Sequence, residues 1–285
     1  MDAQETSMLV KWPQVRLESI ETLKQWLATQ AHLPQVQEHD LALFLHANYG
    51  DLEAAQRTME NYYTHRTSYR ECFTERDIYN DALQAALSIM MFTMLPGETS
   101  EGYKMVYTRL LTSDASHFNH PQILKLITMC LDLWMNIEGS ANGHIMLMDM
   151  QGMNLSHMTK LNMGAAKKHM FYVQEALPIR LKQIHFINVV PFMNQIMFLT
   201  RPFMRKDVQE MINMHVGLNT LHQAVPVESL PNEYGGKGGS FKELEKTFKE
   251  KLYAHSDWFR SMESRDLVDE TKRQSKPKRY MFGLF

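Results

Sequence analysis

The chain is poor in cysteine and has no long apolar segment. Its 285 residues include two cysteines, Cys72 and Cys130, which cannot build a disulfide framework, so we expect a reducing compartment. No run of about 18 apolar residues, the length that crosses a bilayer, is present. The residues after Met1 also lack the basic and apolar regions of a secretory signal. These absences together predict a cytoplasmic protein.

The chain also lacks an excess of charge of either sign. It has 30 Lys and Arg residues against 32 Asp and Glu residues, for a formal net charge of -2. This balance argues against a nucleic-acid binder held by bulk electrostatics. Hydrophobic residues make up 44% of the chain, which is ordinary for a soluble globular protein of one large domain or two modest ones.

No arrangement of residues typical of an enzyme or a metal site is found. Residues 235–240 read Gly-Gly-Lys-Gly-Gly-Ser, which lacks the spacing of a phosphate-binding loop. His117 and His120 are three residues apart, but no third metal ligand stands near them. There is no Gly-x-Ser-x-Gly segment to hold a nucleophile. We therefore predict a protein that is not an enzyme and that has no cofactor and no metal.

Methionine, by contrast, is abundant, with 23 residues. Methionine is flexible and polarizable, so it suits either an ordinary packed core or a surface that adapts to varied apolar shapes. The residues gather in part along two apolar segments, with Met146, Met148, Met150 and Met153 in the first and Met193, Met197 and Met204 in the second.

The second of these segments, residues 191–211, has the period of an amphipathic helix. Phe192, Ile196, Leu199 and Phe203 recur at i, i+4, i+7 and i+11. Its apolar face either seals a solid core or closes a cavity that a hydrophobic ligand fills. The pattern by itself leaves both readings open.

The first third of the chain predicts helices only. After a flexible leader (1–14), apolar residues have helical spacing from 15 to 29. Asp40 and Asp51 are expected to begin two further helices, and Gly50 to end the one between them. Residues 15–75 are thus predicted to form a helical bundle.

Strands alternate with helices from residue 79 onward. The predicted strands are 87–95, 105–111, 143–150 and 182–190, and the predicted helices are 120–138 and 155–176. A short helix and an edge strand are expected over 207–215, followed by a connection over 216–230. Such alternation favours a largely parallel sheet with helices packed on it.

The end of the chain predicts one more helix and a tail. Ser240 and Glu243 form a capping box that opens a helix within 239–263. The tail 264–285 is basic and then apolar. It is expected to be a mobile tail or to make a weak contact with a membrane surface.

Five short segments resemble the CRAL-TRIO lipid-binding family, especially its tocopherol- and retinaldehyde-carrying members. They are Asp149-Met-Gln-Gly, Ile184-His-Phe-Ile-Asn, Arg201-Pro-Phe, Met214-His and Leu230-Pro-Asn-Glu-Tyr-Gly-Gly. The resemblance covers residues 15 to 260. It implies an α/β fold in which an N-terminal helical bundle precedes a lipid-binding domain (79–238), a mostly parallel sheet flanked by helices. A mobile amphipathic helix would act as a gate over an apolar cavity.

The resemblance also implies which residues bind the ligand. The cavity would be lined by Leu126, Cys130, Met148, Met153, Tyr172, Val173, Leu177, Ile179 and Ile184. The gate would add Phe192, Met193, Ile196, Met197, Leu199 and Met204. Tyr172 and His144 are the polar groups proposed to orient a head group.

In the tocopherol-type members a basic cluster outside the gate binds phosphoinositide. The residues here that would form it are Arg180, Lys182, Arg201, Arg205 and Lys206. The chain departs from the family pattern at Asp207 and Met211, and at His46 and Asn48, where basic residues are usual. The same five residues are also compatible with an ordinary solvated surface.

The function that the resemblance implies is intracellular binding and transfer of a hydrophobic small molecule, a retinoid, tocopherol, carotenoid or similar isoprenoid lipid. The expected partners are this ligand and, transiently, a membrane surface with phosphoinositide. The alternative is a lipid- or phosphoinositide-sensing regulatory module that acts through a protein partner.

Overall fold

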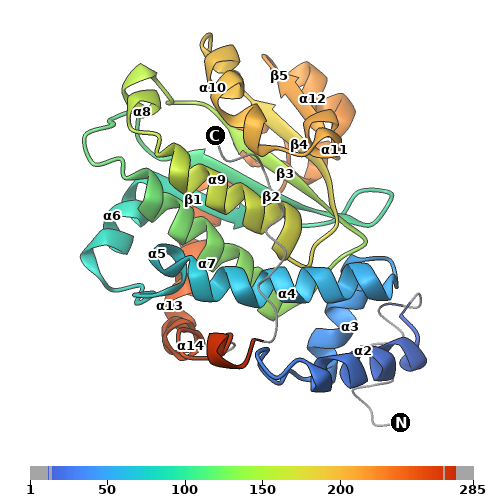
Figure 1. Cartoon of the computed structure of the whole chain (residues 1–285). Helices are drawn as coiled ribbons and strands as arrows, with labels where there is room; N and C mark the ends of the chain where they lie inside the picture. Colours follow the sequence, from blue (N-terminus) through green and yellow to red (C-terminus); the bar gives the residue numbers. More distant parts are fainter. Residues whose placement is uncertain (1–11, 13–14, 266, 274–285) are drawn as a thin grey trace.

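An N-terminal block of helices and a five-stranded sheet covered by helices make up the structure, which is a computed structural model (Figure 1). It describes residue 12, residues 15–265 and residues 267–273. The mixed α/β architecture with a mostly parallel sheet confirms the predicted fold class. Most of the predicted leader (1–14) and the end of the predicted tail (264–285) lie outside the described residues.

Helices alone form the N-terminal block. They are α2 (Leu17–Thr29), α3 (Glu38–Ala47), α4 (Leu52–Ser68) and α5 (Arg70–Phe73). α3 ends at Ala47, and the turn after it contains Gly50, whose φ of 81° favours glycine. The Asp51 carboxylate then accepts a hydrogen bond from the Ala54 N–H at 2.9 Å, which caps α4. Asp40 does not cap α3 as predicted. It lies in the first turn, and its carboxylate accepts from the N–H of the true N-cap residue, Gln37.

Trp12 attaches this block to the rest of the molecule. Its side chain is buried, and the indole N–H donates to the Ser140 carbonyl at 3.1 Å. The ring also stacks on His46 at 5.0 Å between centroids. Trp12 falls within the predicted flexible leader, but a buried indole with its N–H satisfied fixes this point of the chain.

The sheet has strand order β1-β2-β3-β4-β5, with β1 antiparallel to β2 and the other neighbours parallel. Its strands are β1 (Met90–Met94), β2 (Tyr103–Leu110), β3 (Gly143–Asp149), β4 (Leu181–Ile187) and β5 (Ile212–His215). The first strand starts later than predicted, because residues 87–89 belong to α6 (Asp81–Ile89). A short apolar run does not by itself distinguish a strand from a buried helix.

Each parallel strand is added on the same side of the one before it. Connections between parallel strands are right-handed, so all the crossover helices lie on one face of the sheet. These are α7 (His120–Glu138), α8 (Leu155–Thr159), α9 (Met163–Phe171) with the π-helix Tyr172–Ala176, α10 (Met193–Thr200) and α11 (Lys206–Glu210).

Other elements cover the opposite face and the β1 edge. They are α12 (Leu218–Ala224), the 3-10 turns Val227–Ser229 and Asn232–Tyr234, and α13 (Phe241–Ala254). After α14 (Ser256–Met262) the chain returns to the N-terminal block, where the Asp269 N–H, just before the 3-10 turn Glu270–Lys272, donates to the His32 carbonyl at 2.9 Å. The capping box of Ser240 and Glu243 is confirmed at the start of α13. The predicted connection 216–230 is wrong in part, since it contains α12.

Two long predicted helices are interrupted. The helix predicted over 155–176 breaks between α8 and α9, because Asn162 caps a new helix by accepting from the Ala165 N–H. The helix predicted over 191–211 ends at Thr200, and Arg201–Phe203 forms a 3-10 turn before α11. Pro202 has no N–H to continue the helical hydrogen bonds, so the predicted apolar stripe is split there.

A buried ionic cluster joins the N-terminal block to the crossover helices. The Asp132 carboxylate on α7 accepts from Arg66 of α4 and from Arg76, each at 2.8 Å, and from the Tyr172 hydroxyl at 2.9 Å. Burial by itself would raise the pKa of Asp132, but the two guanidinium groups hold that pKa below its usual value. The cluster therefore depends on one ionised carboxylate.

We predict that Asp132→Asn destabilises the protein by about 3–5 kcal/mol at pH 7, because it leaves two buried arginines without a counter-charge. Urea unfolding measures this loss. Glu71→Gln, which removes an exposed ion pair with Lys168, is the matched control and changes stability by less than about 1 kcal/mol.

The same variant has a predicted pH dependence. The folded-state pKa of Asp132 is lowered, so its contribution is present above the unfolded pKa of about 4 and is lost as the pH falls through the folded value. The difference in stability between wild type and Asp132→Asn should shrink on acidification below about pH 4. A difference that stays constant from pH 7 to pH 3 would contradict this account of the cluster.

Candidate functional site

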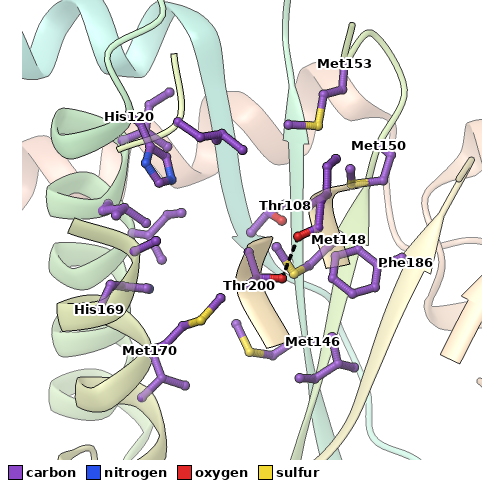
Figure 2. Close-up of a pocket in the computed structure, with 18 of the residues that line it drawn as sticks. Thr108, His120, Met146, Met148, Met150, Met153, His169, Met170, Phe186 and Thr200 are labelled. Carbon is purple, nitrogen blue, oxygen red and sulfur yellow. Dashed lines mark hydrogen bonds between the residues drawn. The ribbon is translucent and has the colours of Figure 1, made fainter. Parts of the chain in front are cut away.

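A cavity of about 270 Å³ lies between the sheet and its crossover helices. One wall comes from α7 and α9, the other from β2, β3, β4 and β5, and α10 with the turn after it closes the space (Figure 2). The surface is overwhelmingly apolar. The cavity thus separates the sheet from the crossover helices that cover this face.

Nine of the 23 methionines line this cavity. They come from both walls and from the closing segment, and they are Met90, Met146, Met148, Met150, Met153, Met163, Met170, Met197 and Met204. Figure 2 shows Met146, Met148 and Met150 on the sheet wall and Met170 on the helical wall. The unusual composition therefore serves a cavity whose flexible side chains can adapt to an apolar occupant.

Among the described lining residues, no charged side chain is directed into the cavity. Arg109 and Asp149 are the only charged residues there, and strand alternation turns both side chains to the opposite face of the sheet. The Arg109 guanidinium lies 4.0 Å from the Phe241 ring centroid. The Asp149 carboxylate accepts from the hydroxyls of Tyr107 and Tyr234, each at 2.6 Å.

Several polar side chains line the cavity, and two of them already make hydrogen bonds to the protein main chain. The Thr200 hydroxyl donates to the Ile196 carbonyl at 2.9 Å, and the Gln174 amide donates to main-chain carbonyls. His120 and His169 are imidazoles on the helical wall (Figure 2). Burial lowers the pKa of His120 to about 4, and burial with nearby imidazoles lowers that of His169 to about 3, so both rings are neutral at physiological pH.

The turn between β4 and α10 is held by a buried hydrogen-bond network. Asn188 has a φ of 51°, and its amide donates to the Asp149 carboxylate at 2.9 Å and to the Tyr234 hydroxyl at 2.7 Å. Burial, with the nearby Asp149 carboxylate, raises the pKa of Tyr107 and of Tyr234, which keeps both as hydrogen-bond donors. Three of the segments that carry the family resemblance therefore meet at this carboxylate.

Part of the predicted ligand-binding set lies on the cavity wall. These residues come from β3 and the turn after it, from β4, from the π-helix and from the closing segment, and they are Met148, Met153, Val173, Ile184, Ile196, Met197 and Met204. Their binding of a ligand remains a prediction.

The structure places the other predicted ligand-binding residues outside this cavity. Leu126, Tyr172 and Leu177 are buried in the main core, and Ile179 packs against its margin. Cys130 lines a separate hollow beside Trp134. Met193, the first residue of α10, and Phe192 before it pack in the apolar cluster of β4 and α10 without lining the cavity, and Leu199 is 37% exposed. The period of a helix does not reveal which neighbouring layer its apolar face meets.

The polar groups proposed to orient a head group are also elsewhere. The Tyr172 hydroxyl is used by Asp132, and His144 is buried against Trp134 at 4.5 Å between ring centroids. His120 and His169 were not predicted from the sequence as cavity residues. For the sheet wall a signal was available, since residues at every second position of a strand share one face, as Met146 and Met148 of β3 do.

Three of the five predicted phosphoinositide-binding residues form hydrogen bonds or ion pairs with other residues of the protein. Arg180 is buried and donates from Nε to the His46 carbonyl at 2.9 Å. Lys182 donates to the Tyr49 hydroxyl at 2.7 Å. Arg205 pairs with Glu175 at 3.1 Å and with Asp207. Arg201 and Lys206 are exposed after α10.

Comparison with known families defines the class of protein. The CRAL/TRIO domain matches residues 90–236, and a Pinta-like UBA domain matches residues 12–83. The chain belongs to the CRAL/TRIO family of lipid-binding proteins, as the sequence resemblance predicted.

Individual relatives agree with this assignment. The chain is 28% identical over 231 residues to an alpha-tocopherol transfer protein-like protein of Homo sapiens, covering 80% of this chain and 67% of that protein. It is 24% identical over 228 residues to clavesin-1 of Rattus norvegicus, covering 79% and 64%. The crystal structure of Sfh5 shares the fold, with a TM-score of 0.55 at 12% identity over 84% of this chain and 98% of that one.

The described residues hold neither a membrane-spanning helix nor a cluster of metal ligands. No helix there is long and apolar enough to cross a membrane. In the same part of the chain, no group of three or more His, Cys, Asp or Glu residues is placed to hold a metal ion.

We predict that Asn188→Ala lowers the free energy of unfolding by about 2–3 kcal/mol, because it removes two hydrogen bonds and because alanine tolerates a left-handed backbone less well than asparagine does. Asn188→Gly loses the same bonds without the conformational penalty, so its loss should be smaller by about 1 kcal/mol. Urea unfolding of both variants measures the difference. Equal losses would show that the positive φ does not contribute.

Proposed function

We propose that this protein binds a hydrophobic isoprenoid of the retinoid, tocopherol or carotenoid kind and transfers it between membranes in the cytoplasm. The observation that supports this most is the apolar, methionine-lined cavity with no charged side chain directed into it. Burying about 300 Å² of apolar ligand surface there contributes about 7–8 kcal/mol at ~25 cal/mol per Å², which corresponds to micromolar affinity. A relative whose name includes alpha-tocopherol transfer supports the same class of ligand.

Transfer requires binding and release and no covalent step. The two cavity imidazoles are each held by a structural hydrogen bond, His120 to the Asn162 N–H and His169 to the Thr128 hydroxyl. The Thr128 hydroxyl beside His169 is fully buried and donates to the Leu124 carbonyl at 2.8 Å, and among the described residues no hydroxyl or thiol is hydrogen-bonded to His120, so neither imidazole has an activated nucleophile. We therefore infer a carrier whose cavity performs no covalent step.

In this proposal α10 is the gate. It is only 8 residues long, and it carries Ile196 and Met197 on the cavity side. Asn188 holds the turn before it, and Pro202 interrupts the chain after it, so the helix is a short unit between two fixed points. Its outward displacement would open the cavity while leaving the sheet intact.

The outer side of the same region supports contact with a membrane. Phe198 is 79% exposed on α10, and Val216 is 84% exposed just after β5. The elements α10 and β5 lie at the same end of the molecule (Figure 1). Arg201 and Lys206 are exposed close by in the sequence. Apolar side chains beside basic ones favour an anionic lipid surface, so any phosphoinositide contact would involve these two residues rather than Arg180.

We predict that Ile196→Asp abolishes ligand retention, because it puts a carboxylate into the apolar cavity. Phe198→Asp is the matched control, two residues along the same helix and facing outward, and it should retain ligand. Native mass spectrometry with organic extraction of the purified protein measures the bound lipid. Full occupancy in a folded Ile196→Asp variant would contradict the placement of this helix over the binding site.

Phe198→Asp should instead slow transfer. Its exposed ring would enter the membrane interface, so its replacement by a carboxylate is expected to reduce the rate of lipid transfer between phosphatidylserine-containing vesicles by about tenfold. Fluorescence dequenching of a labelled lipid follows that rate. A wild-type protein that holds lipid but transfers none, and that forms a stable complex with a protein partner, would favour the regulatory alternative.

A further inference from the structure

Two methionines of the strand β3 present their accessible surface to the cavity. This strand lies inside the sheet, with β2 and β4 on either side, yet Met146 and Met148 are only half-buried. Ile145 and Leu147, which point to the other face of the same strand, are 1% and 0% exposed. Met170 is also half-buried, on the opposite wall (Figure 2). A molecule in the cavity therefore meets these thioethers.

The chain holds methionines in three different environments. Met146, Met148 and Met170 line the cavity. Met91 is fully buried in the apolar cluster on the other face of the sheet. Met214 on β5 is 41% exposed, and it does not line the cavity. Oxidation of a methionine sulfur requires contact with the oxidant, so an oxidant in the cavity and one in water reach different residues.

We propose that the cavity methionines reduce lipid hydroperoxides and that the sulfoxides formed expel apolar cargo. This rests on the proposed function and adds to it a modification site and the chemical class of the reactant. Isoprenoid and other unsaturated chains have allylic C–H bonds, which react with oxygen to give hydroperoxides. A hydroperoxide is neutral, so it enters without the desolvation cost that a carboxylate would meet in a cavity with no charged side chain directed into it.

The reaction transfers one oxygen atom and two electrons. A lone pair of the methionine sulfur attacks the terminal oxygen of the hydroperoxide, so that an S–O bond forms as the O–O bond breaks. The proton on the terminal oxygen moves to the departing alkoxide, and the lipid leaves as an alcohol. The sulfur is oxidised to a sulfoxide, and the peroxide is reduced. Neither Cys72 nor Cys130 lines the cavity, so methionine supplies the sulfur there.

A sulfoxide changes what the cavity binds. Its S–O group is polar and accepts hydrogen bonds, whereas the thioether is apolar. Two donors that line the cavity, the Thr200 hydroxyl and the Gln174 amide, already donate to main-chain carbonyls. Water therefore enters to pair with the sulfoxide oxygen, and an apolar chain that displaces this water leaves the oxygen unpaired. We expect each sulfoxide to raise the Kd of an apolar ligand about tenfold.

Peptide mapping by mass spectrometry after treatment with two oxidants tests the site of oxidation on the full-length protein. The apolar oxidant is the hydroperoxide of methyl linoleate, and the water-soluble one is hydrogen peroxide. The lipid hydroperoxide should oxidise Met146, Met148 and Met170 about tenfold faster than Met214, and hydrogen peroxide should give the opposite order. Met91 should stay reduced with both. The lipid alcohol should form in the same molar amount as the sulfoxide.

A triple variant tests whether these sulfurs control the affinity. Met146→Leu, Met148→Leu and Met170→Leu together keep the apolar volume and remove three thioethers. Displacement of Nile red by methyl stearate, which is not oxidised, gives Kd before and after treatment with the lipid hydroperoxide. The Kd of the wild type should rise at least about tenfold on treatment, and that of the triple variant less than about threefold. Met214→Leu is the matched control and should respond as the wild type does.

The outcomes are distinguishable. Oxidation of Met214 by the lipid hydroperoxide as fast as the cavity methionines would overturn the proposal while leaving hydrophobic binding established. An unchanged Kd after oxidation of the cavity methionines, or an equal rise in the triple variant, would do the same. If methyl stearate displaces no Nile red from the untreated protein and the purified protein carries no extractable lipid, the proposed function fails and the proposed oxidation fails with it.

Discussion

Right-handed connection between parallel strands is the constraint on which the rest of this structure depends. Because β2, β3, β4 and β5 are added in a single direction, the handedness of each crossover sends its helices to the same face. That face receives a full layer of helices from three successive connections, and the opposite face is left to α12 and the segment after it. The cavity lies in the crowded layer, where helices of different lengths and breaks do not pack evenly on the sheet.

Two buried carboxylates hold this layer in place. Asp132 joins α4 and the π-helix to α7 through two arginines and a tyrosine hydroxyl. Asp149 joins the strand ends to the turn before α10 through Tyr107, Tyr234 and Asn188. Both are hydrogen-bonded on each oxygen, as buried carboxylates must be to persist in a folded protein. The frame around the cavity is therefore more strongly specified than the short helix that closes it.

The elements with clear local signals were predictable. The period of residues 120–138 matches α7, the alternation of 143–150 matches β3, and the capping box of Ser240 and Glu243 begins α13 as expected. The errors lie where a local signal has two meanings. Residues 87–89 continue a helix instead of starting a strand, and the single residue Pro202 divides a stripe that otherwise has perfect helical period.

Some features of the cavity follow from local sequence, and others depend on contacts between distant segments. Three properties of the sequence determine that an apolar, adaptable interior forms on a parallel sheet. They are the methionines at alternate positions of β3, the scarcity of charge among the apolar residues, and the family segments that contain Asp149, Asn188 and Tyr234. Which side chains face the cavity is decided by contacts between residues far apart in the chain. Arg180 donates a hydrogen bond to the His46 carbonyl, and the Tyr172 hydroxyl donates to Asp132, so neither side chain faces the cavity. The packing of α7 against α9 brings His120 and His169 to one wall. Only the tertiary structure makes these choices, because a side chain's partner is set by which surfaces the fold brings together.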